Sequence, residues 1–224
     1  MGIGYEYMQR SRYSQMEEDS SDQQKGLPQP PLEQPAPVGA TYIALPDPHT
    51  VGLAPLDFVA LLEKRATLRR YAPEPLTLTE LAYLLWASLG VKEVLPHSTR
   101  RTVPSAGARH ALETYLLAFR VEGLELGVYR YLPLEHELLL EFQEPHLRRQ
   151  IIEATLGQSF IGESAVTFVW TAVPYRMEWR YGLAAHKVIA LDAGHVCQNL
   201  YLACEAVGAG TCAVAAYHQQ LMDR

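Results

Sequence analysis

The sequence of 224 residues contains no uninterrupted run of about 18 apolar residues, the length that a membrane-spanning helix needs. Its first 24 residues are too polar to contain the apolar centre of a secretory signal. Basic side chains are outnumbered, with 19 Lys and Arg against 25 Asp and Glu and a formal net charge of -6, which argues against a general affinity for nucleic-acid phosphates. We therefore expect a cytoplasmic protein that binds neither membranes nor nucleic acid.

Cysteine is scarce, and metal-binding patterns are missing. The three cysteines, Cys197, Cys204 and Cys212, form no C-x-x-C pair, and an odd number cannot complete a set of disulfides. His195 has no second histidine three to five residues away, and a single helical histidine is more often structural than catalytic. Gly208-x-Gly210 follows a predicted helix, whereas a dinucleotide-binding motif follows a strand. We expect buried thiols and no metal site.

Proline is concentrated near the N-terminus, with eight residues between Pro28 and Pro55. Proline fixes the backbone φ angle and removes a hydrogen-bond donor, so we interpret residues 1–52 as an extended arm and residues 53–224 as one domain. The arm is either a disordered leader or a segment that wraps a neighbouring subunit. In the second case its anchors would be apolar side chains, namely Leu27, Leu32, Tyr42, Ile43 and Leu45.

The remaining pattern interleaves helices and strands, which predicts an α+β fold. Pro55 can open a short helix that ends near Lys64. Thr77 and Glu80 form a capping box for the next helix, and Gly90 can take a left-handed cap. Later elements are predicted as strands at 113–121, 128–131, 137–142, 165–173 (a central strand) and 211–217, with helices at 145–156 and 186–207, the last ending at Gly208.

Two segments have residue types that suit a bound ligand. Within residues 65–71 (R-A-T-L-R-R-Y), the five residues from Arg65 to Arg69 hold two guanidinium groups and a hydroxyl, and arginine donates paired hydrogen bonds to phosphate oxygens. The same run could instead be a solvated helix end. Residues 101–110 (R-T-V-P-S-A-G-A-R-H) form a turn of small residues that a flat ligand can approach, or simply a rigid connection with a capping serine.

Taken with the D-A-G-H-x-x-Q-N-L-Y-L segment (residues 192–202) and the G-x-G-T-C that follows it, these segments resemble the nitroreductase superfamily. Residues 75–91 (P-L-T-L-x-E-L-x-Y-L-L-W-A-S-x-G-V) and 103–115 resemble its SagB-like dehydrogenase branch. The resemblance covers about residues 53–222. It implies a central, mixed but mostly antiparallel sheet flanked by helices, in an interlocked homodimer that holds FMN between its subunits.

The resemblance also implies roles for individual residues. Arg65, Thr67 and Arg69 would hold the phosphate and ribityl chain, with the backbone of Ala66. The segment that reaches the flavin from the partner subunit would be Pro104, Ser105, Ala106 and Gly107, and the segment along the isoalloxazine ring would be Ala213, Val214, Ala215 and Ala216. No residue is expected to be a catalytic acid or base, because hydride transfer belongs to the flavin; NAD(P)H or O2 would be the redox partner.

The substrate side is less defined. Azoline oxidases of this branch use a Lys-Tyr pair, whereas here Lys187 is followed by Val188, so azoline oxidation is not favoured over another small-molecule or peptide substrate. Lys187, the one candidate for a catalytic side chain, is joined by Arg176 and Trp179 as candidate substrate contacts. All three could instead serve only in packing or salt bridges.

Two departures from the family pattern leave other functions open. Relatives place a glycine near Ala215 and Ala216, and they continue into a final C-terminal strand, which we expect this domain to lack. A catalytically inactive, flavin-free scaffold that binds a partner is therefore the alternative to an FMN-dependent oxidoreductase. An enzyme that consumes its flavin is a third possibility.

Overall fold

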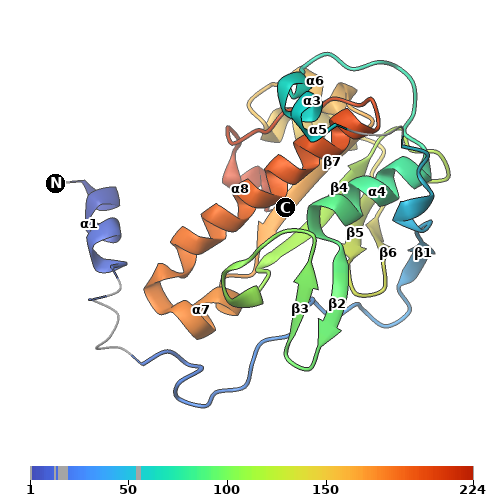
Figure 1. Cartoon of the computed structure of the whole chain (residues 1–224). Helices are drawn as coiled ribbons and strands as arrows, with labels where there is room; N and C mark the ends of the chain where they lie inside the picture. Colours follow the sequence, from blue (N-terminus) through green and yellow to red (C-terminus); the bar gives the residue numbers. More distant parts are fainter. Residues whose placement is uncertain (1, 13, 15–19, 54–56, 224) are drawn as a thin grey trace.

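The computed structural model describes residues 2–12, 14, 20–53 and 57–223. Its centre is a five-stranded sheet in which each neighbouring pair is antiparallel (Figure 1). The order across the sheet is β1 (Thr41–Ala44), β6 (Glu137–Phe142), β5 (Gly127–Leu132), β4 (Leu112–Ala118) and β7 (Val166–Ala172). The predicted α+β class with a mostly antiparallel sheet is confirmed.

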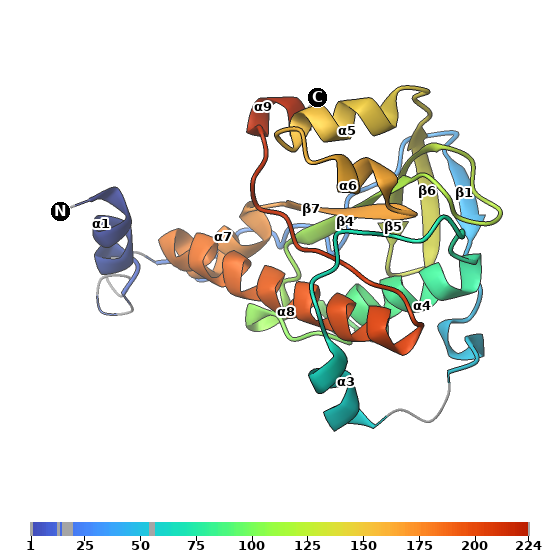
Figure 2. The same cartoon turned by 90° about the horizontal axis from the view of Figure 1, so that it is seen from above.

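Helices cover both faces of this sheet (Figure 2). One face carries α4 (Leu78–Leu89) and the long α8 (Ala185–Ala206), and the other carries α5 (Leu147–Ala154) and α6 (Ser159–Glu163). Successive residues of a strand point to opposite faces. Accordingly, Leu116 of β4 packs in the core with α4 and α8, whereas its neighbour Leu117 packs with α5 and α6.

Helix α4 begins as its sequence predicts but ends differently. Thr77 and Glu80 make both hydrogen bonds of the capping box. Gly90, however, has φ -61° and ψ 142°, so the predicted left-handed cap is wrong. The chain continues at once into a hairpin of β2 (Val91–Leu95) and β3 (Ser98–Arg101), two strands that the sequence pattern does not predict, and the hairpin requires an extended residue at position 90. A Cβ at Gly90 would lie only 2.4 Å from the Trp86 ring.

Two further predictions need correction, and a third falls partly outside the described residues. Helix α3 (Phe58–Lys64) is capped by Asp57, and the predicted start at Pro55 lies outside the described residues. Among the described residues, strand β7 pairs with β4 alone and lies at the end of the sheet, so it is not central. Residues 212–218 form no strand; Thr211 makes a single parallel bridge to Thr67, and a short helix, α9 (Gln219–Met222), follows.

Residues 27–34 of the N-terminal segment contact the chain's own domain. Residues 3–10 form a helix, α1 (Ile3–Arg10), rather than an extended segment. Farther along, β1 joins the sheet beside β6, so Tyr42 and Ile43 pair with strand residues of the same chain. The remaining short elements are η1 (Pro48–Thr50), η2 (Ala106–Ala108), α7 (Tyr175–Tyr181) and η3 (Gly182–Ala184). Among the described helices, none combines the length and the apolar character that a membrane span requires.

Candidate functional site

A cleft of about 670 Å³ runs along β7, the strand at the end of the sheet. All of β7 contributes to its lining, because the strand has no neighbour on its outer edge in the described chain. Helix α8 forms one wall through Ala193, Cys197 and Leu200, and α6 contributes Phe160. Three of the four residues expected along the flavin ring, Ala213, Val214 and Ala215, line the cleft, and Ala216 does not.

The predicted phosphate-binding residues lie beside this cleft. The backbone N–H of Leu68 donates to the Thr211 carbonyl at 3.0 Å, which joins residues 65–69 to the C-terminal segment. The Tyr201 hydroxyl accepts a hydrogen bond from the Ala213 N–H at 2.9 Å and lies 3.1 Å from the Thr67 hydroxyl. Two segments that are about 145 residues apart in the sequence therefore share one wall of the site.

Two guanidinium groups beside the cleft, within residues 65–69, carry charge without a salt-bridge partner among the described residues. Arg65 lies over the Tyr201 ring at 5.5 Å, and Arg69 over the Phe160 ring at 5.9 Å. Within the described residues, no carboxylate forms a salt bridge with either side chain. The Ala66 N–H, in contrast, is taken by the Glu205 carboxylate at 3.3 Å. Residues 65–69, called the basic strip below, can therefore offer arginine side chains to an anion more readily than the Ala66 backbone.

The turn that contains Pro104, Ser105, Ala106 and Gly107 lies elsewhere. Its Ala106 N–H donates to Asp192 of α8 at 3.3 Å. Asp192 and Tyr201 are nine residues apart on the same helix, which corresponds to roughly 14 Å along its axis. Within one chain, this turn is therefore separated from the basic strip, and the cleft lining does not include it.

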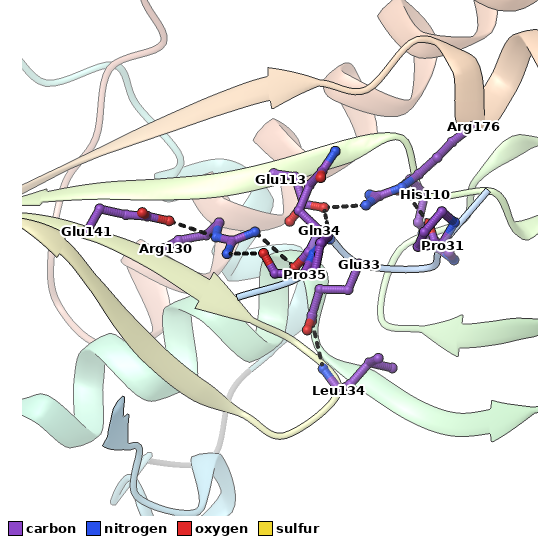
Figure 3. Close-up of polar contacts among 10 residues, drawn as sticks. All are labelled: Pro31, Glu33, Gln34, Pro35, His110, Glu113, Arg130, Leu134, Glu141 and Arg176. Carbon is purple, nitrogen blue, oxygen red and sulfur yellow. Dashed lines mark hydrogen bonds and ion pairs between the residues drawn. The ribbon is translucent and has the colours of Figure 1, made fainter. Parts of the chain in front are cut away.

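The three candidate substrate contacts all touch the N-terminal segment. Arg176 pairs with Glu113 at 2.5 Å and donates to the Pro31 carbonyl at 2.8 Å (Figure 3). The Trp179 indole N–H donates to the Leu27 carbonyl at 3.0 Å. The Lys187 ammonium donates to the Ser11 carbonyl at 3.1 Å. None of the three lines the cleft.

Figure 3 also shows contacts that the sequence reading missed. Arg130, in the fully buried strand β5, donates to the carbonyls of Gln34 and Pro35 and lies 2.8 Å from the Glu141 carboxylate. The Gln34 N–H donates to Glu113 at 2.9 Å. A charged residue within an otherwise apolar strand was the available signal, since a buried charge needs a partner.

Among the histidines and cysteines, burial shifts the pKa of His110 and of Cys204 most clearly. Burial, reinforced by the nearby Arg101, lowers the pKa of His110 to about 3, so its ring is neutral near pH 7. Burial raises the pKa of the Cys204 thiol to about 12. Cys197 and Cys212 are only half-buried and line the cleft, which corrects the expectation of three buried thiols. His195 is exposed, and the described residues contain no cluster able to hold a metal.

The family model for nitroreductases matches residues 62–224, nearly three-quarters of the chain. The chain belongs to the nitroreductase family. A nitroreductase-like protein of Methanocaldococcus jannaschii is 35% identical over 176 residues, covering 79% of this chain and 84% of that protein. The trifolitoxin-processing protein TfxB of Rhizobium leguminosarum bv. trifolii is 32% identical over 113 residues, which are 49% of this chain and 30% of TfxB.

Solved structures show the same nitroreductase fold. A nitroreductase-like protein of Ralstonia eutropha matches with a TM-score of 0.61 and 28% identity, over 82% of this chain and 83% of that one. A protein of this kind from Anabaena variabilis matches with a TM-score of 0.68 and 23% identity, over 91% of this chain and 38% of that one. A chain in the Escherichia coli microcin synthetase McbBCD complex, solved with truncated pro-MccB17 bound, has a TM-score of 0.50 and 18% identity, over 92% of this chain and 78% of that chain.

Proposed function

We propose that this nitroreductase-family protein is a cytoplasmic FMN-dependent oxidoreductase that transfers hydride between the flavin and a small-molecule or peptide substrate. One observation carries the proposal: an apolar cleft along β7 ends beside two guanidinium groups that no carboxylate in the described residues neutralises. FMN has this same division between a flat apolar ring system and a phosphate dianion.

The residues present fit such a group in size and in chemistry. The cleft volume of about 670 Å³ lies within the range of roughly 300 to 1,000 Å³ that ligand pockets occupy. Phe160 and Trp170 in its lining give flat apolar surfaces, and Arg65 and Arg69 donate charge-assisted hydrogen bonds suited to a phosphate. The Thr67 hydroxyl would supply a neutral donor between them. Bound FMN would supply the hydride chemistry, and the chain would bind it, orient it and exclude water from it.

A homodimer follows from the same proposal. In our interpretation the turn at residues 104–107 belongs to the flavin site. The turn contacts Asp192 and the basic strip contacts Tyr201, and these two residues lie roughly 14 Å apart along helix α8. A second copy of the chain would bring its own turn to this cleft. Each of two equivalent sites would then combine residues from both subunits.

The proposed SagB-like branch, and with it a peptide substrate, draws support from two relatives. TfxB is named for trifolitoxin processing, and the McbBCD complex was solved with truncated pro-MccB17. NAD(P)H or O2 remains the proposed redox partner. Because Arg176, Trp179 and Lys187 contact the N-terminal segment, we propose the cleft lining itself as the place where the substrate meets the flavin.

A flavin-free scaffold is the second candidate, and one contact favours it. The Glu205 carboxylate accepts the Ala66 N–H at 3.3 Å, which places a negative charge at the end of the cleft where the phosphate would bind. Like charges repel most strongly where water is partly excluded. In a scaffold of this kind Arg65 and Arg69 of the basic strip would only pack over the rings of Tyr201 and Phe160.

FMN titration of the purified protein tests the proposal. We expect saturable binding with flavin absorption bands, weakened about 10- to 150-fold by Arg65→Ala or by Arg69→Ala, because loss of one charge-assisted partner costs about 1.5 to 3 kcal/mol. Arg100→Ala is the matched control, since this exposed arginine lies on the β2–β3 hairpin and pairs with Glu93. A protein that stays colourless in excess FMN would favour the scaffold. Flavin absorption that disappears on incubation would favour a flavin-consuming enzyme.

A further inference from the structure

The turn at residues 105–110 holds an unusual backbone conformation. Gly107, Ala108 and His110 have φ values of 57°, 53° and 46°, in the left-handed region. For residues other than glycine this region costs roughly 1 to 2 kcal/mol each. Such a conformation persists only where surrounding contacts fix it, and it is concentrated at functional sites.

The contact that fixes the start of this turn comes from α8. Asp192 is only 6% exposed, and its Oδ1 accepts the Ala106 N–H at 3.3 Å. The Ser105 hydroxyl, which lies next to this carboxyl group, accepts the His110 N–H at 2.9 Å. Asp192 thus fixes the first residues of the turn, and Ser105 links them to its last residue.

The other oxygen of the same carboxylate, Oδ2, is buried and has no hydrogen bond of its own within the described residues, although the Ser105 hydroxyl lies beside the group. Burial raises the pKa of Asp192, while the Ser105 hydroxyl, the Ala106 N–H and His195 act in the opposite direction. A buried carboxylate with an unsatisfied oxygen is costly for folding alone. The hydrogen-bonded oxygen of this carboxylate is the one that holds Ala106, so its contact in the described chain is with the turn.

We propose that Asp192 is a positioning residue for the flavin site: its carboxylate holds Ser105 and Ala106 so that residues 104–107 keep the shape in which they reach the flavin of a second subunit. This inference rests on the proposed function. A second observation on α8 supports it: Ala193, the residue after Asp192, lines the cleft. One rigid helix therefore positions the turn on one side and forms the cleft wall on another.

Two substitutions separate this role from simple packing. Asp192→Asn keeps an oxygen that can accept the Ala106 N–H and places an amide where Oδ2 has no partner. Asp192→Leu has a similar shape but no acceptor. Positioning by hydrogen bonding predicts that Asn preserves the turn and that Leu releases it, whereas a packing role predicts little difference between them.

The experiment measures amide hydrogen exchange in the flavin-free full chain, followed by FMN titration. In Asp192→Leu we expect the Ala106 and His110 amides to exchange about 2- to 10-fold faster than in the wild type and FMN to bind weaker by a similar factor. Asp192→Asn should keep both the amide exchange rates and the FMN affinity at their wild-type values. The amide of Leu116 in β4 serves as the internal reference, because it lies in the central sheet.

The outcomes distinguish this inference from the proposed function. Unchanged exchange and unchanged FMN affinity in Asp192→Leu would overturn the role of Asp192 and leave the flavin proposal standing. A wild-type chain that binds no FMN would overturn both. If Asp192→Leu does not fold, Ser105→Ala tests the link from the turn side, because it removes the acceptor of the His110 N–H. Unchanged His110 exchange in Ser105→Ala would then count against the inference.

Discussion

At the scale of single residues, the buried pair of Arg176 and Glu113 gives the sharpest energetic prediction. Each side chain is 4% exposed, and the two charges lie 2.5 Å apart. Among the described residues, Arg176→Ala would leave the buried Glu113 carboxylate with the Gln34 N–H as its hydrogen-bond partner and with Arg101 as a nearby charge. We expect the free energy of unfolding to fall by about 3 to 5 kcal/mol, as measured by urea denaturation.

Two comparisons control this measurement. Arg100→Ala removes one partner of an exposed ion pair and should cost less than about 1 kcal/mol. The double variant Arg176→Met with Glu113→Leu should recover much of the loss, because no unpaired charge remains. A small effect of Arg176→Ala alone would show that the pair does not anchor the arm, and it would return Arg176 to the set of candidate substrate contacts.

At the scale of elements, local sequence patterns predicted those helices and strands that local contacts determine. The capping box at Thr77 and Glu80 and the left-handed Gly208 both follow from nearby residues. Strand β6 has its predicted bounds, and a turn at residues 133–136 directly precedes it. The position of β7 at the end of the sheet could not be predicted from its apolar run, because neighbours are chosen by contacts distant in sequence.

The candidate site likewise has one part that the sequence predicted and one part that it did not. The grouping of residues 65–69 with 211–215 follows the family resemblance, and the Leu68–Thr211 hydrogen bond brings these segments together. The docking of the arm depends instead on donors contributed by separate elements: Arg130 of β5 and Arg176 and Trp179 of α7. Proline-rich segments offer carbonyls without the matching N–H groups, and a single sequence does not indicate which side chains will satisfy them.

Docking of this arm should depend on pH through Glu33. Burial, followed by the charge of Glu135, raises the pKa of Glu33 from 4.5 to about 7, and Glu113 acts in the same direction. The Leu134 N–H and Arg101 lower it, but by less. Because the folded pKa is the higher one, the folded chain binds the proton more tightly than the unfolded chain. Stability is therefore lost as pH rises from about 4.5 to 7 and stays reduced above that window.

The variant Glu33→Gln tests this sign, because glutamine stays neutral. At pH 8 the variant should be more stable than the wild type by about 1 to 2 kcal/mol, a value reduced to allow for solvent screening of a side chain that is partly exposed. Near pH 4.5 the two proteins should unfold together. Thermal unfolding at several pH values provides the measurement. A wild type that is the more stable protein at pH 8 would reverse the argument.

At the scale of the whole molecule, β7 is the feature that a single chain explains least. Strand edges that remain unpaired are normally short, charged or covered, because they can pair with other chains. Here the strand has seven residues, without a charged side chain, and its outer side borders the cleft. A second subunit that closes this side would complete the proposed flavin site and cover the edge at the same time.

This arrangement makes stability depend on the concentration of the chain. For an obligate dimer the thermal midpoint rises when protein concentration is raised, because association favours the folded state. We expect a mass in solution of twice 25.1 kDa and a further gain of about 2.7 kcal/mol with FMN at 100 times its Kd. Arg65→Ala should reduce the stability gained from FMN at a fixed FMN concentration and leave the dependence of the midpoint on protein concentration unchanged, since Arg65 lies at the phosphate end of the cleft.

A midpoint independent of protein concentration, with the mass of one chain, would contradict the dimer. If FMN nevertheless bound to that single chain, residues 104–107 would not belong to its site, because they lie apart from the cleft within one chain.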